Sequence, residues 1–509
     1  MTGDIPASDA GAAFRQHFRR ILALDPDAPA IEFESQWMTW HALSLAADIV
    51  AESLAATSII PGEPVGVILR NRPASIGLLV GTTLAGGCVV VLNPHVGPQR
   101  VRDEVDALGL RLVSGEPSDI DALFGDDPPP AVATFAVAAL GAPGRLTAAA
   151  RSGVAAETRV DTAIRLLTSG TTGPPKRSDL TYETLQRVLE GAKHYESQRS
   201  DDVRLRDGVV IVNSPLVHLG GVFRVVQAFH DGRRISLLER FTVEDWVDRV
   251  RRHQPKTASL VPAALRMVLD ADIDPSDIAS LRSVVSGTAP LSPETAEAFT
   301  TKYGVPVLTN YAATEFGGGV AGWNLADHRR YWHEKRGSVG RAHPGCELRV
   351  VDETAGASLD AGNVGLLEVR AAQLGGATWV RTTDLARLDE DGFLWILGRA
   401  DQTIIRGGLK VQPDTVRRAL ERHPAVRAAA VIGVDDDRLG QVPVAVVEPT
   451  RPGAIDSAEL LTFSAETLAR YEIPVAIVIV DSLPRTESGK ADLHAIRKLV
   501  PPSTRDREG

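Results

Sequence analysis

Short apolar runs alternate with longer amphipathic stretches through the first part of the chain. Residues 41–54 and 73–84 have the length and pattern of helices, whereas residues 64–69 and 89–92 resemble short buried strands. Strands that alternate with helices of this length form βαβ units around a mostly parallel sheet. The alternation therefore predicts an α/β fold. Residues 118–159 are rich in alanine, glycine and proline, and we expect them to form a loose surface connection.

The stretch LLTSGTTGPPKR at residues 166–177 has the composition of a phosphate-binding loop. Its small residues expose backbone N–H groups, its hydroxyls add donors, and its lysine adds a positive charge. Two prolines before the lysine distinguish it from the nucleotide-triphosphatase loop, which needs a glycine there and a helix afterwards. An ordinary surface loop is the alternative. The candidate phosphate-binding residues are Thr168, Ser169, Gly170, Thr171, Thr172, Gly173 and Lys176.

Three more polar loops each follow an apolar strand of the expected sheets. They are SPLVHLGG at 214–221, GTAP at 287–290 and AATE at 312–315. Open α/β sheets bind ligands beyond the carboxyl ends of their parallel strands. We therefore expect the three loops to line one crevice.

The expected secondary structure changes from about residue 337. Short strands separated by turns indicate a smaller β unit, and a further segment with its own helices and strands follows residue 401. The expected architecture is α/β. A large N-terminal domain of parallel-type sheets plus a small β unit covers residues 1–400, and a small mobile α+β domain covers residues 401–509.

Composition narrows the possible functions. The net charge of -10 over 509 residues argues against a nucleic-acid binder, which usually carries a basic stripe. Only Cys88 and Cys346 occur, so no disulfide framework or multi-cysteine metal site is expected, and a reducing cytoplasmic location fits best. The N-terminus lacks the apolar core of a signal peptide. The apolar run at 76–92 has paired glycines at its centre, which favours a buried helix and strand over a membrane span.

Seven motifs in order along the chain resemble the adenylate-forming, or AMP-binding, superfamily of acyl- and aryl-CoA synthetases, luciferases and peptide-synthetase adenylation domains. They are TSGTTGPPK, NSPLVHLGG, SGTAPLS, NYAATEFG, RTTDLARLDEDGFLWILGRAD, IIRGGLKVQP and LPRTESGK. The resemblance spans roughly residues 31–497. It implies a ligase that uses ATP, Mg²⁺ and coenzyme A. A carboxylate first attacks the α-phosphorus of ATP to give an acyl-adenylate and pyrophosphate, and a thiol then displaces AMP.

The resemblance also assigns roles to matching residues of the large domain. The loop from Thr168 to Lys176 would hold the β- and γ-phosphates. Thr314 would contact phosphate, and Glu315 would be the catalytic glutamate associated with Mg²⁺. The expected adenosine-binding residues are Gly287, Thr288, Ala289, Tyr311, Asp384 and Arg399.

In the C-terminal domain, the resemblance makes Lys490 the catalytic lysine that bridges the substrate carboxylate and the α-phosphate. Asp401 would be the hinge about which this domain rotates between the two half-reactions. Gly407 and Gly408 would line the channel for the thiol arm of coenzyme A, where absent side chains leave room.

The acyl pocket is expected beside His218, Gly220, Gly317 and Gly318. The loop lacks the aspartate with which relatives specific for amino acids bind the substrate ammonium, so an α-amino acid is disfavoured. The glycines favour an apolar pocket for a fatty, alicyclic or aryl acid, although close backbone packing would explain them equally well. Thr383 and Arg406 stand where the family usually has a glycine and a lysine.

Other functions remain open at this stage. The acceptor could be an acyl carrier protein, which presents the same phosphopantetheine thiol, and the oligomeric state is not fixed, a homodimer being one possibility. A catalytically silent acyl or nucleotide binder is the alternative from a different class, although the retention of Glu315, Asp384 and Lys490 argues against it.

Overall fold

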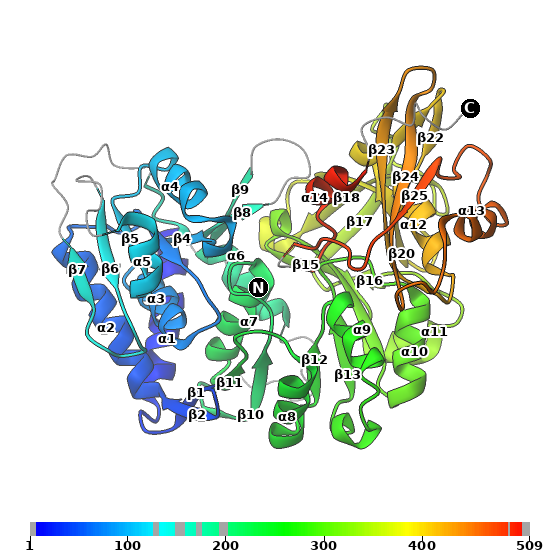
Figure 1. Ribbon diagram of the computed structural model, residues 1–509. Helices are drawn as coiled ribbons and strands as arrows, with labels where there is room; N and C mark the ends of the chain where they lie inside the picture. Colours follow the sequence, from blue (N-terminus) through cyan, green and yellow to red (C-terminus); the bar gives the residue numbers. More distant parts are fainter. Residues whose placement is uncertain are drawn as a thin grey trace.

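The computed structural model describes residues 7–125, 132–147, 158–168, 176–192, 202–486 and 489–500. Five sheets and their covering helices make up these ranges (Figure 1). The phosphate-loop candidates Ser169, Gly170, Thr171, Thr172 and Gly173 lie outside the described residues, and only the backbone of Thr168 and Lys176 is described.

The first sheet has seven strands, and its central strands are parallel. In spatial order the strands are β7 (Arg145–Thr147), β6 (Ala133–Ala136), β5 (Leu112–Gly115), β3 (Pro64–Ile68), β4 (Cys88–Leu92), β8 (Thr162–Thr168) and β9 (Lys176–Thr181). The central strands read PVGVI and CVVVL and are buried throughout, as parallel strands covered on both faces must be. Strand β9 turns back antiparallel to β8, so Thr168 pairs with Lys176.

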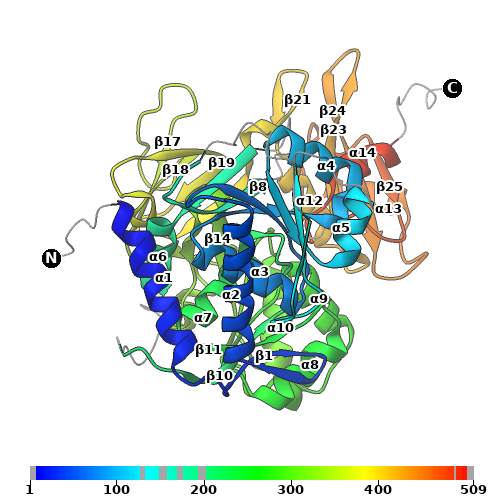
Figure 2. The same ribbon diagram turned by 90° about the vertical axis from the view of Figure 1, so that its left-hand side faces the viewer.

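Helices cover this sheet, and three of them share the same start signal. They are α1 (Ala7–Ala23), α2 (Trp40–Ala56), α3 (Pro73–Leu84), the single turn η1 (Pro94–Val96), α4 (Pro98–Ala107), α5 (Pro117–Phe124) and α6 (Tyr182–Ala192). Helices α3, α4 and α5 each begin with a proline, whose fixed φ suits the first helical turn. Helices α1 and α2 contact each other along one side of the molecule (Figure 2).

The second sheet packs against the first through a shared core in which Trp40 meets Phe229 edge to face. Its strands, in order, are β10 (Arg206–Val212), β11 (Arg233–Leu237), β1 (Pro29–Phe33) and β2 (Gln36–Thr39). Helices α7 (Leu219–His230) and α8 (Val243–His253) belong to this unit. Strand β1 pairs in parallel with β11, so the start of the chain is joined to a segment some two hundred residues later.

The third sheet combines parallel and antiparallel strands around its own hydrophobic cluster. Its strands are β12 (Thr257–Ser259), β13 (Ser283–Ser286), β14 (Val307–Ala313), β15 (Gly318–Gly322) and β16 (Arg341–Ala342). Its helices are α9 (Pro262–Asp270), η3 (Pro275–Ile278), α10 (Pro293–Tyr303), η4 (Thr314–Phe316) and α11 (Leu325–Tyr331). The first three strands are parallel, so the loops after β13 and β14 leave the same edge.

An antiparallel sheet follows, and the C-terminal segment forms the last one. The strands of the fourth sheet are β17 (Cys346–Val351), β18 (Val364–Ala371), β19 (Val380–Leu388) and β20 (Leu394–Arg399), with η5 (Ala372–Leu374) between β18 and β19. The last sheet holds β22 (Leu409–Val411), β21 (Ile404–Arg406), β24 (Gly440–Pro449), β23 (Val426–Asp436) and β25 (Ala476–Ile479). Helices α12 (Pro413–Glu421), α13 (Ser457–Ala465) and α14 (Leu493–Leu499) cover it. Its two hydrophobic clusters contain residues of this segment alone.

The predicted α/β architecture is confirmed, with a large N-terminal part and a small C-terminal part. The turn η6 (Ala400–Gln402) joins the two parts. A boundary at Asp401, between residues 1–400 and 401–509, remains our proposal. None of the described helices has the length and apolar character that a membrane span requires.

One prediction about local structure was wrong, and several helices were not predicted, α1 among them. The expected loose connection at residues 118–159 contains α5 and strands β6 and β7, which extend the first sheet. Strand β6 is only four residues long but fully buried, so its packing outweighs the flanking glycines and prolines. Helix α1 was not predicted, although Phe14 and Phe18 on it are buried.

Candidate active site

A single cleft of about 2220 Å³ lies between the large part and the C-terminal segment. The carboxyl-end loops of the third sheet, helix α7 and the loop after β25 all contribute to its walls. Predicted site residues that line it are His218, Gly220, Gly287, Thr288, Ala289, Tyr311, Thr314, Glu315, Gly318, Asp384, Arg399 and Lys490. Residues more than 250 positions apart in sequence are therefore brought to one site.

Tyr311 and Asp384 meet directly in this cleft. The Tyr311 hydroxyl donates a hydrogen bond to the Asp384 carboxylate. Burial raises the pKa of Asp384, and this hydrogen bond opposes that rise. Burial and the neighbouring carboxylate also raise the pKa of Tyr311, so its hydroxyl stays protonated and remains a donor. The two oxygens of Asp384 thus form a fixed acceptor pair at the edge of an aromatic ring.

Arg399 lies across from Asp384 on the neighbouring strand. The two residues are cross-strand partners in β19 and β20. Arg399 forms a bidentate ion pair with Asp401, through hydrogen bonds of 2.9 and 2.7 Å. Hydrogen bonding to Asp401 raises the pKa of Arg399. The ion pair joins the end of the fourth sheet to the turn that leads into the C-terminal segment.

Thr383, a departure from the usual family glycine, is exposed in the extended strand β19. It is not among the residues with positive φ, so the backbone there does not require glycine. The other departure, Arg406, donates hydrogen bonds to the carbonyls of Tyr471 and Ile473 at 2.8 and 3.0 Å. It therefore ties strand β21 to the segment before β25.

The loop after β13 is strained at one position. Thr288 has φ of 71°, in the left-handed region that β-branched residues rarely adopt. A Cβ added at the preceding Gly287 would come within 3.0 Å of the Asn310 carbonyl. The loop is thus held close to β14, beside Tyr311. Strain of this kind is a recognised feature of ligand-binding loops.

Thr314 and Glu315 begin the short turn η4, directly after β14. The Ser178 hydroxyl of β9 donates to the Thr314 carbonyl at 3.1 Å. Strand β9 emerges from the phosphate-loop candidate, so this bond links that hairpin to the turn that carries Glu315. The first and third sheets are therefore joined at the site.

Lys490 reaches the cleft from the C-terminal segment. Burial lowers the pKa of Lys490 and so does Arg399, whereas Glu315 and Asp384 raise it. Lys490, Glu315 and Asp384 therefore line one cleft and influence one another's charge there. The backbone supports this position, because the Thr486 N–H donates to the Lys490 carbonyl at 2.7 Å.

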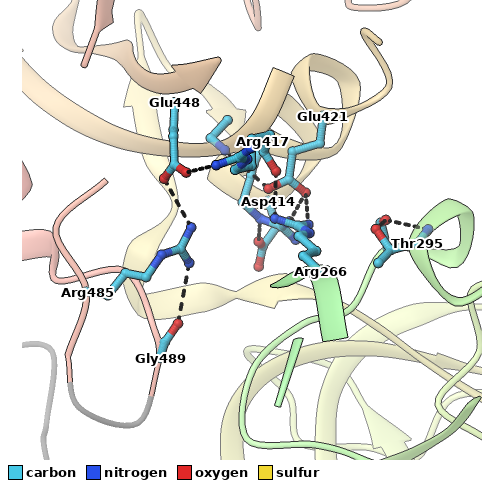
Figure 3. Close-up of polar contacts among 11 residues, drawn as sticks. Arg266, Thr295, Asp414, Arg417, Glu421, Glu448, Arg485 and Gly489 are labelled. Carbon is cyan, nitrogen blue, oxygen red and sulfur yellow. Dashed lines mark hydrogen bonds and ion pairs between the residues drawn. The ribbon is translucent and has the colours of Figure 1, made fainter. Parts of the chain in front are cut away.

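A cluster of charged side chains fixes the C-terminal segment against the large part (Figure 3). Arg485 pairs with Glu448 at 3.4 Å and donates to the carbonyl of Gly489, which precedes Lys490. On α12, Arg417 pairs with Glu421 at 2.6 Å. Arg266 of α9 approaches the same Glu421 at 3.8 Å. The segment that carries Lys490 is thus held by ion pairs within it and across the junction.

His218 is the residue before α7 and is largely enclosed. Burial, with a smaller effect of the Lys490 charge, lowers the pKa of His218 to about 4. Its Nε2 is buried and has no hydrogen-bond partner among the described residues. The imidazole is therefore neutral at pH 7 and has an unused polar atom in the cleft wall.

The glycines near His218 have different structural roles. A Cβ added at Gly220 would meet nothing within 4 Å, so this residue faces open space. A Cβ at Gly221 would overlap the Pro215 carbonyl oxygen at 2.2 Å, so this glycine serves close packing. Gly317 has φ of 68° and lies against Thr184 rather than in the cleft wall, whereas Gly318 does line the cleft.

The predicted hinge and channel residues lie outside the set that lines the cleft. Gly407 and Gly408 both have positive φ and form the two-residue turn between β21 and β22, where Arg406 pairs with Leu409. Asp401 lies in η6. Their roles as hinge and thiol channel remain predictions for a second arrangement of the two parts.

The cleft also contains residues that the motifs did not indicate. His343 contacts the Asn310 side-chain oxygen at 2.8 Å, and burial lowers the pKa of His343 to about 4. Arg224 of α7 also lines the wall. No spacing rule places an arginine six residues after His218 in a ligand site. Only the packing of α7 reveals it.

Comparisons with known proteins give a consistent result. The family model of AMP-binding enzymes matches residues 18–377, and that of the AMP-binding enzyme C-terminal domain matches residues 416–490. The chain is 29% identical to indoleacetate–CoA ligase of Aromatoleum aromaticum, over 94% of this chain and 97% of that protein. It is 30% identical to 2-succinylbenzoate–CoA ligase of Bacillus cereus, over 94% of this chain and 96% of that one.

Among solved structures, the fold is similar to ATP-bound MatB from Rhodopseudomonas palustris. The TM-score is 0.79 at 26% identity, and the match covers 95% of this chain and 98% of that one. The apo form of the same enzyme matches with a TM-score of 0.68. The arrangement described here is therefore closer to the nucleotide-bound form.

Proposed function

Because the chain belongs to the family of AMP-binding enzymes, we propose that it joins a carboxylic acid to the thiol of coenzyme A with ATP as the energy source. The observation that carries this proposal is the meeting of Lys490 with Glu315, Asp384 and Arg399 in one cleft. A site that only bound a nucleotide, without catalysing a reaction, would not need a lysine from a separate part of the chain.

In the first step, a carboxylate oxygen of the acid attacks the α-phosphorus of ATP and pyrophosphate leaves. Two negatively charged groups must approach each other, so the barrier is mainly one of charge and alignment. Lys490 is suited to bridge the carboxylate and the α-phosphate, because its ammonium group lies in the cleft beside acidic groups. Asp384 is suited to accept the two ribose hydroxyls, and the Tyr311 ring to lie against adenine.

Magnesium is the metal of this reaction in the family. The described residues contain no cluster of three or more acidic, histidine or cysteine side chains suited to a metal. Glu315 in the cleft wall supplies one carboxylate, which fits an ion that takes its remaining ligands from phosphates and water. When bound, Mg²⁺ would neutralise phosphate charge, and Glu315 would hold it.

In the second step, the thiol attacks the acyl carbonyl, AMP leaves, and the thiol proton is released. Coenzyme A is the acceptor that the family relationship supports. A carrier protein with the same thiol arm remains an alternative acceptor. We propose that Asp401 acts as the hinge for this step and that Gly407 and Gly408 then approach the thiol arm. A homodimer and a cytoplasmic location also remain predictions.

The nature of the acid is less constrained. One relative acts on indoleacetate, which has a single carboxylate, and the other on 2-succinylbenzoate, which has two. The sequence identities to these two relatives are nearly equal, so sequence similarity does not distinguish a monocarboxylic from a dicarboxylic substrate. The neutral His218 and the open space at Gly220 support an organic acid of some size.

The proposal is tested by measuring AMP and pyrophosphate release with a panel of carboxylic acids, with and without coenzyme A. We expect acid-dependent AMP release that needs ATP and Mg²⁺. Lys490→Ala should lower adenylate formation at least about a hundredfold, because a charge that acts in the transition state is lost. ATP affinity should change little.

Lys498→Ala is the matched control, because Lys498 is exposed on α14 of the same C-terminal segment and does not line the cleft. Adenylation by the Lys490 variant at the wild-type rate would refute the role of this lysine. A wild-type protein that binds ATP but releases no AMP with any acid would instead be a silent binder.

A further inference from the structure

Arg224 is the feature of the cleft that the proposed reaction does not explain. It lies on α7 with Gly220, Phe223 and Gln227, all of which line the cleft on one helical face. Arg224 is partly buried, and this burial lowers the pKa of its guanidinium group. No ion pair or hydrogen bond of its guanidinium group is found within the described parts of the chain.

Three other arginines of the same cleft are paired. Arg399 binds Asp401, Arg417 binds Asp414 and Glu421, and Arg336 binds Glu297. A partly buried arginine in a cleft wall, without a protein partner, loses part of its hydration without compensation and is available to an anionic ligand. The contrast between Arg224 and these arginines therefore points to a missing anion.

The carboxylates of α6 that line the cleft do not fill this place. On α6, Glu183 forms an ion pair with Arg187 at 2.6 Å, and Glu190 accepts a hydrogen bond from Gln186 at 3.3 Å. Neither carboxylate contributes to the pKa of Arg224. A ligand is thus the natural source of the negative charge.

The position along α7 indicates which part of a ligand Arg224 faces. His218, just before the helix, lines the cleft, and the charge of Lys490 helps to lower its pKa. Arg224 is five residues beyond the first residue of α7, about 7.5 Å along the helix axis. The guanidinium group therefore lies farther from the reacting carboxylate than the imidazole does, with the open space at Gly220 between them along the helix.

We propose that the substrate is a dicarboxylic acid whose second carboxylate pairs with Arg224 while the first is activated beside Lys490. This inference rests on the proposed function and makes its substrate class specific. The two carboxylates must be separated by several bonds, with an aliphatic or aryl body against Phe223. The expected substrates were fatty, alicyclic or aryl acids. The proposal narrows them to acids that carry a second carboxylate at the far end.

The test compares acids that share a carbon skeleton. Full-length protein is assayed for AMP release with octanoate against suberate, and with phenylacetate against its para-carboxy derivative. We expect kcat/KM to favour the dicarboxylate of at least one pair by about a hundredfold, because a site built for a polar group rejects analogues without it. Arg224→Met should abolish that preference by lowering kcat/KM for the dicarboxylate, with no loss for the monocarboxylate. Arg224→Lys should retain part of it.

Arg329→Met is the matched control, because Arg329 is exposed on α11 and does not line the cleft. It should leave the preference unchanged. Equal kcat/KM within each pair for wild type, or an unchanged preference in Arg224→Met, would overturn the inference while the ligase function stands.

Thermal unfolding gives a readout that does not depend on turnover. The preferred dicarboxylate should raise the Tm of wild type but not that of Arg224→Met. Without ligand, the variant should melt no lower than wild type, because the substitution removes an unpaired charge. Such a ligand-dependent shift without any AMP release would support the inference and refute the proposed function. A variant that melts well below wild type would show that Arg224 is structural and overturn the inference.

Discussion

At the scale of single residues, the cleft depends on groups that hold one another in a definite protonation state. Asp384 must be ionised to accept two ribose hydroxyls, yet burial raises its pKa. The Tyr311 hydroxyl opposes this by donating a hydrogen bond. A residue expected to contact adenine therefore also keeps the neighbouring carboxylate charged.

Tyr311→Phe tests this coupling. Without the hydroxyl, the pKa of Asp384 should rise further, so kcat/KM for ATP should begin to fall at a higher pH as the solution is acidified. A hydrogen bond to a charged group contributes about 1.5–3 kcal/mol, so the loss at low pH should be roughly tenfold or more. The measurement is the pH profile of pyrophosphate exchange.

Tyr303→Phe serves as the control for Tyr311→Phe. Tyr303 donates to the Val268 carbonyl at 3.0 Å and should not affect the profile. If kcat/KM for ATP in Tyr311→Phe began to fall at the same pH as in wild type, the coupling would be contradicted.

Single residues also show how far sequence reasoning extended. Thr314 and Glu315 could be predicted because they lie in a loop that follows a strand, and Asp384 because its motif matches that of the family. Arg224 was not, because its significance depends on the absence of a carboxylate nearby, which only packing reveals. Gly220 and Gly317 looked equivalent in sequence, but one faces open space and the other lies against Thr184.

At the scale of elements, the attachment of β1 to α8 is a charged contact inside the fold. Glu32 of β1 is fully buried. It pairs with Arg249 at 2.7 Å, with Arg252, and with His253 at 2.6 Å, all on α8. Sequence patterns do not predict this contact, since its partners are about 220 residues apart.

Glu32→Gln should destabilise the protein by about 3–5 kcal/mol at pH 7, because it leaves buried cations without a counter-charge. Burial raises the pKa of Glu32, but hydrogen bonds that include those from Arg252 and His253 outweigh it and lower the pKa. The contribution of the carboxylate is therefore present above the unfolded pKa of about 4.3 and is lost as pH falls through the lower folded value.

Urea unfolding of both proteins at several pH values measures this effect. The difference between wild type and Glu32→Gln should shrink as the pH falls below about 4. Glu34→Gln, at an exposed position of the neighbouring turn, is the control. A constant difference across this range would exclude ionisation as its cause.

At the scale of the whole molecule, contacts from α9 help to hold the C-terminal part in the arrangement that delivers Lys490. Arg266 of α9 donates to the Arg427 carbonyl at 2.8 Å and approaches Glu421. Arg427 in turn approaches Asp270 of α9 at 3.4 Å. These contacts must break if the C-terminal part rotates, so they bias the equilibrium between arrangements.

Arg266→Met should therefore lower adenylate formation several-fold and leave thioester formation from supplied acyl-adenylate unchanged or faster. The two half-reactions are separated by pyrophosphate exchange and by single-turnover transfer to coenzyme A. Arg329→Met is again the control. Equal loss in both half-reactions would show that Arg266 does not act through the arrangement of the two parts.

Asp401→Pro should have the opposite effect. A proline in the turn between the two parts restricts backbone rotation. Thioester formation should fall more than adenylate formation, in the same pair of assays. Equal impairment of both steps would refute the proposed hinge.

The parallel pairing of β1 with β11 has a consequence for how the protein is made. Ile31 lies beside Ile235, so the strand near the start of the chain cannot complete its sheet until some two hundred more residues have been synthesised. At typical rates of synthesis this takes about 10–40 s. During that interval an apolar strand near the N-terminus emerges from the ribosome without its partner. Yield in cells should accordingly depend on chaperones that shield nascent chains.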